Sequence, residues 1–148
     1  MPDILFYHLE TRPLEAVLPQ LLEKTLERGW RAVVEVGSTE RAEALDSHLW
    51  TWRDDSFIPH GLSGSDKDGD QPVLLTTGTD NPNGAAVRFF VDRAVPQSAD
   101  GYERIVYMFS GHDPDAVAEA RQAWVALKPG GGLTYWQQEP DGRWVKKA

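Results

Sequence analysis

Side chains suited to metal or nucleophile chemistry occur in this chain of 148 residues, but not at catalytic spacing. The four histidines are His8, His48, His60 and His112, and these intervals do not match those of zinc ligands. Cysteine is absent and no serine lies in a GxSxG turn, so the sequence offers no candidate nucleophile for thiolate or serine-hydrolase chemistry. Between Pro59 and Gly61, His60 is predicted to hydrogen-bond neighbouring backbone.

The acidic segment 63–71, SGSDKDGDQ, is similar in composition to a calcium loop. Aligning Gly69 with the glycine that such a loop requires puts Gly64 at the first ligand position and Leu75 at the last. Neither side chain can bind calcium. The segment contains no apolar residue, so it is predicted to be an exposed, mobile loop.

Three further carboxylates, Asp3, Glu35 and Asp92, fall near the ends of apolar runs. Paired carboxylates at strand ends can hold the divalent metal of a nuclease. A metal-dependent nuclease therefore stays open as the alternative function, although scattered acidic residues are expected in any acidic chain.

Nucleotide binding is rejected from the glycine pattern. The turn after the first strand reads HLETRPL and has no glycine, and no GxxxxGK[ST] motif occurs. Gly37 is isolated, and the glycines at 130–132 follow a helix instead of preceding one. No cofactor is predicted.

Charge and composition favour protein partners over nucleic acid. Fifteen basic and twenty-three acidic residues give a net charge of −8, which repels nucleic acid unless a basic groove forms locally. Direct nucleic-acid contact is therefore expected to be weak or indirect. The six tryptophans fit either a core or an interface. No apolar run approaches membrane-spanning length, and the start MPDILFYHL has no basic leader, so a soluble, unprocessed, cytoplasmic chain is expected.

The hydrophobic periodicity predicts one α/β domain over residues 1–148. A strand at 4–7, a helix that begins at Pro13 and a strand at 31–36 form a parallel crossover. Pro19 is expected to weaken that helix, and Gly29 to end it. Further predicted elements are a helix from 39, strands at 73–77, 87–91 and 105–109, and a C-terminal hairpin of 133–138 and 143–146. A helix at 114–128 is also predicted, which Asp113 caps and Pro114 starts.

The predicted helix 114–128 carries a candidate binding patch. Arg121, Trp124 and Lys128 are spaced by three and four residues, so two cations flank an aromatic side chain. Such a patch can bind an acidic peptide that ends in an apolar residue. The alternative is a core tryptophan beside two ordinary surface cations, since the helix also has an apolar stripe of Val117, Ala120, Trp124 and Leu127.

The segment 45–62, LDSHLWTWRDDSFIPHGL, has many apolar and aromatic residues and no active-site spacing. Leu45, Leu49 and Trp50 share one face of a helix end. An extended run follows, closed by the turn residues Pro59 and Gly61. The segment is therefore interpreted as a surface for a partner protein.

The pattern LDxxLWT followed by SF-hydrophobic-PHGL resembles the chi subunit family of the bacterial DNA polymerase III holoenzyme. The resemblance continues at Phe6, at Tyr7, in the ARxxW pattern of 120–124 and in the closing strand. It implies a Rossmann-like, three-layer α/β fold with a mainly parallel sheet and no nucleotide-binding loop. It also implies a non-catalytic subunit of the clamp-loader complex, which bridges the psi subunit and the C-terminal tail of single-stranded DNA-binding protein during DNA replication.

Site residues follow from the same resemblance. Trp50 and Phe57 occupy motif positions that imply the psi interface. The tail of single-stranded DNA-binding protein is expected at the patch of Arg121, Trp124 and Lys128. Val125 departs from the family pattern, because some relatives carry a lysine there.

Overall fold

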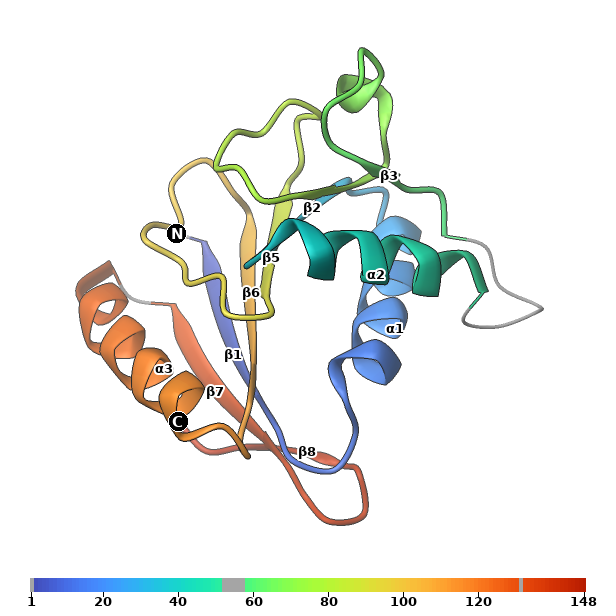
Figure 1. Ribbon diagram of the computed structural model, residues 1–148. Coiled ribbons are helices and arrows are strands. Elements are labelled where there is room, and N and C mark those ends of the chain that lie inside the picture. The colour runs from blue at the N-terminus through green and yellow to red at the C-terminus, as the bar shows by residue number, and fades with distance from the viewer. Residues whose placement is uncertain (1, 52–57, 131) are drawn as a thin grey trace.

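The computed structural model describes residues 2–51, 58–130 and 132–148 (Figure 1). Its eight-stranded sheet has the order β3-β4-β2-β5-β6-β1-β7-β8, and every neighbouring pair is parallel except β7 and β8. The α/β class and the mainly parallel sheet are confirmed. The elements are β1 (Asp3–Leu9), α1 (Leu14–Glu27), β2 (Ala32–Val36), α2 (Thr39–Thr51), β3 (Gly61–Leu62), β4 (Val73–Thr76), β5 (Val87–Val91), β6 (Arg104–Ser110), α3 (Pro114–Leu127), β7 (Leu133–Gln138) and β8 (Trp144–Lys146).

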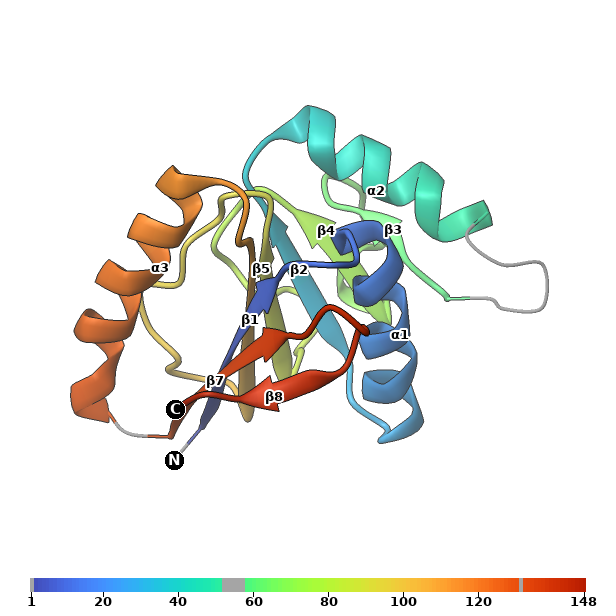
Figure 2. The same cartoon turned by 90° about the horizontal axis from the view of Figure 1, so that it is seen from below.

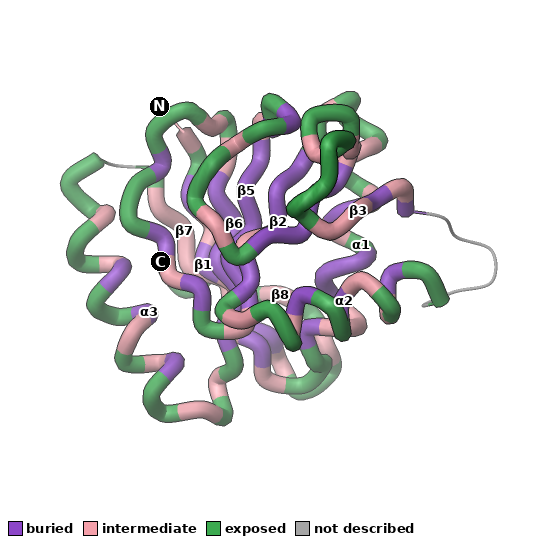
Figure 3. The backbone as a smooth tube through the Cα atoms, turned by 45° about the horizontal axis from the view of Figure 1, so that its top comes forward, coloured by how far each residue is buried: buried purple, intermediate pink, exposed green. Residues whose placement is uncertain are grey.

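The α-helices cover the two faces of the sheet unequally (Figure 2). α1 and α2 pack on one face, where their leucines join the apolar side chains of β2 and β4 in one cluster. α3 packs alone on the other face through Ala116, Ala120 and Ala123. Because both faces are covered, the central strands are buried throughout, as Figure 3 shows in purple.

α3 begins as the sequence predicts. The carboxylate of Asp113 accepts hydrogen bonds from the backbone N–H groups of Asp115, at 3.0 Å, and Ala116, at 3.4 Å. Pro114 occupies the first helical position, where its missing N–H costs nothing. The helix therefore has a fixed start, which determines which of its residues face the sheet.

α1 continues through Pro19, although the sequence predicted a weak point there. A proline inside a helix leaves the carbonyl four residues earlier without its helical donor, and that carbonyl belongs to Glu15. In the structure, Nε2 of His48 lies 2.7 Å from the Glu15 carbonyl oxygen. A side chain of α2 thus replaces the hydrogen bond that Pro19 removes, and it also links the two helices.

The acidic segment 63–71 forms a compact, exposed turn that contains the 3-10 helix Asp68–Asp70. The carboxylate of Asp68 accepts hydrogen bonds from the backbone N–H groups of Gly64, at 2.9 Å, and Ser65, at 3.1 Å. These bonds lower the pKa of Asp68. Its oxygens therefore serve the turn itself. None of the helices in the described chain is both long and apolar enough to cross a membrane.

The bond between His48 and Glu15 predicts a specific coupling with Pro19. Replacing His48 with alanine leaves a half-buried carbonyl unpaired, so the free energy of unfolding should fall by about 1–3 kcal/mol. In a Pro19→Ala background the new N–H of residue 19 can bond that carbonyl, and the same His48→Ala change should cost clearly less.

Urea unfolding of the four proteins in this double-mutant cycle measures the coupling. An equal loss of stability in both backgrounds would show that His48 does not replace the helical donor.

Candidate functional site

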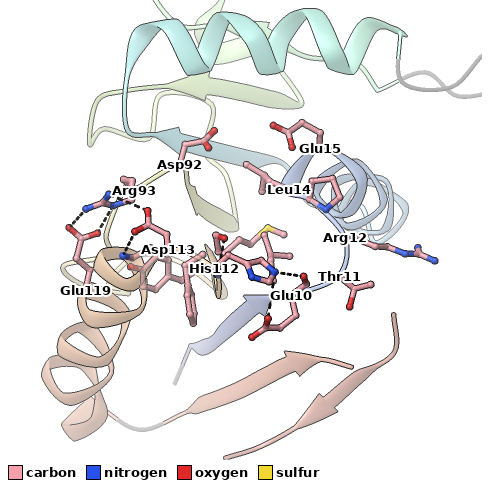
Figure 4. A pocket seen from close by; sticks show the side chains of 17 residues that line it. Glu10, Thr11, Arg12, Leu14, Glu15, Asp92, Arg93, His112, Asp113 and Glu119 are labelled. Atoms are coloured by element: carbon pink, nitrogen blue, oxygen red, sulfur yellow. Dashed lines mark hydrogen bonds and ion pairs between the residues drawn. The ribbon is translucent and has the colours of Figure 1, made fainter. Parts of the chain in front are cut away.

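A crevice of about 510 Å³ opens at the carboxyl ends of β1, β5 and β6 (Figure 4). β1 and β6 are parallel neighbours, but the helix after β1 packs on one face of the sheet and the helix after β6 on the other. In open α/β sheets such a change of direction leaves a crevice where ligands commonly bind. The crevice is therefore the first place to test for chemistry.

Ion pairs between different elements occupy the walls of this crevice. Arg93 bonds both carboxylate oxygens of Glu119, at 2.7 and 2.9 Å. Arg41 of α2 lies 2.7 Å from a carboxylate oxygen of Glu15 and 3.2 Å from one of Asp92. Burial acts to raise the pKa of Glu15, but hydrogen bonds from its backbone N–H and from Arg41 lower it on balance. The pKa of Asp92 is raised by burial.

The residues after β1 do not form a phosphate site. Pro13 precedes α1 and offers no N–H, and the carboxylates of Glu10 and Glu15 line the crevice beside it. Nε2 of His112 is hydrogen-bonded to the carbonyl oxygen of Glu10, at 2.6 Å. Negative side chains at this helix start disfavour a phosphate.

A backbone bend after β5 explains the isolated glycine of the sequence. Asp92 and Arg93 have φ values of +48° and +78°, which non-glycine residues seldom adopt. A Cβ at Gly37 would lie 2.0 Å from the Asp92 carbonyl oxygen, so any side chain at position 37 would clash with the bend. Gly37 thus has a structural task at the crevice.

The carboxylates of the nuclease alternative do not come together. Asp3 begins β1, whereas Glu35 and Asp92 lie at the carboxyl ends of β2 and β5. Because these strands run parallel, Asp3 lies at the opposite end of the strands from Glu35 and Asp92. Each carboxylate lies near an arginine: Arg104 at 3.8 Å, Arg88 at 2.6 Å and Arg41 at 3.2 Å. Within the described chain no group of three acidic or histidine side chains is arranged to hold a metal.

Trp124 of α3 rests on aromatic side chains of the sheet. Its ring centroid lies 5.2 Å from that of Phe6, edge to face, and 6.0 Å from that of Tyr135. The Tyr135 hydroxyl is hydrogen-bonded to Nδ1 of His8 at 2.5 Å. Trp124 therefore stays half-buried and is fixed in orientation by the sheet beneath it.

The two predicted cations, Arg121 and Lys128, are exposed on either side of this tryptophan. Among the acidic groups that the structure describes, none lies within ion-pair distance of either one. Val125 is 71% exposed on the same helix. We call Arg121, Trp124, Val125 and Lys128 the α3 surface. The spacing in the sequence predicted that the two cations lie on one side of the helix. It did not predict the contact with Tyr135, because a strand pattern does not show which helix a strand residue will face.

Trp50 is the largest exposed apolar side chain at the end of α2, with 52% of its surface accessible. Its ring centroid lies 4.3 Å from the imidazole of the buried His60. One nitrogen of His60 lies 2.6 Å from the Ile58 carbonyl oxygen, which confirms its predicted backbone bond, and the other lies 3.1 Å from a carboxylate oxygen of Asp46. Trp50 is thus held on an ordered support. Phe57, the second residue predicted for this interface, lies outside the described residues.

Comparisons with known proteins agree on one family. The family model described as DNA polymerase III chi subunit, HolC, matches residues 1–133. A protein of Rickettsia prowazekii (strain Madrid E) named probable DNA polymerase III subunit chi is 29% identical over 87 residues, which cover 59% of this chain and 53% of that protein. DNA polymerase III subunit chi of Pseudomonas aeruginosa is 32% identical over 59 residues, 40% of either chain. The matched regions thus span about half the length of these relatives or less.

Among solved structures, the C-terminal domain of the DEAD-box protein Dbp5 is similar, with a TM-score of 0.57 and 15% identity. The match covers 92% of this chain and 90% of that domain. At this identity the likeness concerns the fold alone.

Proposed function

The chain belongs to the DNA polymerase III chi subunit family, and on that premise we propose that it is a non-catalytic accessory subunit of the holoenzyme. It joins the psi subunit of the clamp loader to the C-terminal tail of single-stranded DNA-binding protein during replication in the cytoplasm. The proposal needs a rigid scaffold with two separate surfaces and no catalytic group. The nuclease alternative lacks support, because Asp3 lies at the opposite end of the parallel strands from Glu35 and Asp92.

The observation that carries the proposal is the α3 surface. Arg121 and Lys128 have no acidic partner in the described structure, and Trp124 between them is fixed by Phe6 and Tyr135. An acidic tail can place carboxylates on the cations and its apolar end against the tryptophan. The chain as a whole carries −8, so attraction is confined to about 8 Å, the Debye length at physiological salt. Binding should therefore be weak, local and sensitive to salt.

The second surface surrounds Trp50, to which we assign the psi subunit. An exposed tryptophan on an ordered support is typical of a residue that dominates an interface. α2, which carries Trp50, and α3 cover opposite faces of the sheet (Figure 2). The two partners would therefore bind without competing for space, as a bridging subunit requires.

Removing either cation of the α3 surface should weaken binding of the tail peptide. For Arg121→Ala and Lys128→Ala we expect a loss of about three- to tenfold each, because exposure reduces the contribution of a charged hydrogen bond. Val125→Lys should strengthen binding, since it adds a cation beside the peptide. Calorimetry with the peptide measures these changes, and single-stranded DNA alone should form no comparable complex.

Lys67→Ala is the matched control for the α3 surface, because it removes the same charge from the exposed segment 63–71. If tail binding is unchanged in both α3 variants and in Val125→Lys, the tail does not bind this helix.

Replacing Trp50 with alanine should weaken binding of the psi subunit by about 2 kcal/mol, the usual cost at a dominant interface residue. Its effect on the free energy of unfolding should be clearly smaller, because half of the ring is already exposed. Surface plasmon resonance with psi and urea unfolding separate the two effects. Val145→Ala, which trims another exposed apolar side chain, serves as control. A variant that binds psi normally but loses several kcal/mol of stability would make Trp50 a structural residue.

A further inference from the structure

A second groove, of about 410 Å³, lies between the C-terminal half of α1 and the strands β1, β5 and β6. It is on the sheet face opposite to α3. Its floor is apolar, because Leu5, Val106 and Phe89 are neighbours on three adjacent strands, and Leu21 of α1 closes one side. Leu5 and Leu21 are only partly buried. The groove therefore offers accessible apolar surface next to the core.

Cations gather at this groove although the chain is acidic. Lys24, Arg28 and Arg104 line it, against the single acidic side chain of Glu27. Lys24 and Arg28 have no ion pair within the described residues. Arg28 and Arg104 lie over the ring of Trp30, at 4.3 and 5.6 Å from its centroid. The tryptophan thus holds two guanidinium groups at one edge of the groove.

Two donors in the groove are not satisfied by the described chain. The Nε atom of Arg104 is buried and has no hydrogen-bond partner, and the nearest carboxylate oxygen to its guanidinium, on Asp3, is 3.8 Å from Nη2. The hydroxyl of Tyr7 also forms no hydrogen bond with a described residue. Burial raises the pKa of Tyr7 while the charge of Arg104 lowers it, so the two groups are close enough to interact. A buried donor without an acceptor, such as Nε of Arg104, is costly. The Arg104 side chain as a whole is 29% exposed, so a carboxylate from outside can reach its guanidinium from the groove.

We propose that this groove binds an acidic peptide segment of a partner protein. A carboxylate of the segment accepts hydrogen bonds from Arg104 and Tyr7, and the apolar side chain next to it packs on Leu5, Val106 and Phe89. Lys24 and Arg28 attract the remaining acidic residues. The site is separate from both surfaces of the proposed function and does not depend on it.

The same residues do not suit a nucleic acid. Single strands bind through bases stacked on open aromatic faces. The Trp30 ring already has the guanidinium groups of Arg28 and Arg104 over it, and Phe89 is buried. A nucleic acid carries a negative charge at every phosphate, so a chain with a net charge of −8 opposes it more strongly than a peptide with a few carboxylates. A peptide with a few carboxylates around an apolar side chain fits both the charge and the aliphatic floor.

The test is an NMR titration of the full chain with a pool of amidated hexapeptides, in which a leucine, isoleucine or phenylalanine stands between aspartates and glutamates. A pool with asparagine and glutamine in their place is the neutral control. We expect the acidic pool to shift the amide resonances of β1, β6 and the end of α1, and the neutral pool to leave them in place.

Two variants assign the contacts. Arg104→Gln and Tyr7→Phe should each weaken binding of the acidic pool about tenfold, the loss expected for one hydrogen bond to a charged group. Lys67→Gln, with the same charge change in the exposed segment 63–71, should bind normally. Arg121→Ala should leave the shifts of the groove resonances unchanged, because Arg121 lies on α3, which covers the opposite face of the sheet. This control keeps a failure of the α3 surface apart from a failure of the groove.

Three results would overturn the proposal. The acidic pool could leave the groove resonances unmoved, or bind equally well to the Arg104 and Tyr7 variants. An oligothymidylate could shift these resonances in place of the peptides, which would make the occupant a nucleic acid. Sedimentation could reveal a dimer that Arg104→Gln dissociates, which would make the groove a contact between copies of this chain.

Discussion

A sheet of parallel strands that is buried on both faces must be covered by the helices that connect its strands. In this chain β1 lies beside β6, but α1 and α3, which follow them, pack on opposite faces. The crevice at the carboxyl ends of these strands results from that arrangement. So does the separation of Trp50, on α2, from the α3 surface. The bridging function we propose thus depends on how a parallel sheet is covered.

In many folds of this class the crevice holds a ligand, whereas here its charged side chains bind each other. Arg41 connects α2 to α1 and to the bend after β5, and Arg93 connects that bend to α3. Gly37 allows the bend to come close enough for both arginines. These contacts stabilise the scaffold at the place where an enzyme would keep groups free for substrate. In the function we propose, recognition is left to outer surfaces, and α3 offers two cations without an acidic partner among the described residues, beside a fixed tryptophan.

Local patterns in the sequence predicted what depends on neighbouring residues. The cap at Asp113, the start at Pro114, the strand runs and the backbone bond of His60 all follow from side chains within a few positions. Contacts between distant segments were not predictable. The bond from His48 that bridges Pro19 joins residues 33 positions apart, and the ring of Tyr135 beneath Trp124 comes from another strand. The two-residue strand β3 was also missed, because its residues belong to a turn pattern.

The central claim is that two partners bind this chain at the same time from opposite faces. The most direct measurement is the affinity of the tail peptide of single-stranded DNA-binding protein for the chain alone and for the chain saturated with its psi subunit. The account predicts equal dissociation constants and one complex of all three components in sedimentation. A tail affinity that falls as psi is added, with psi released by excess tail, would show a shared surface and contradict the bridging role.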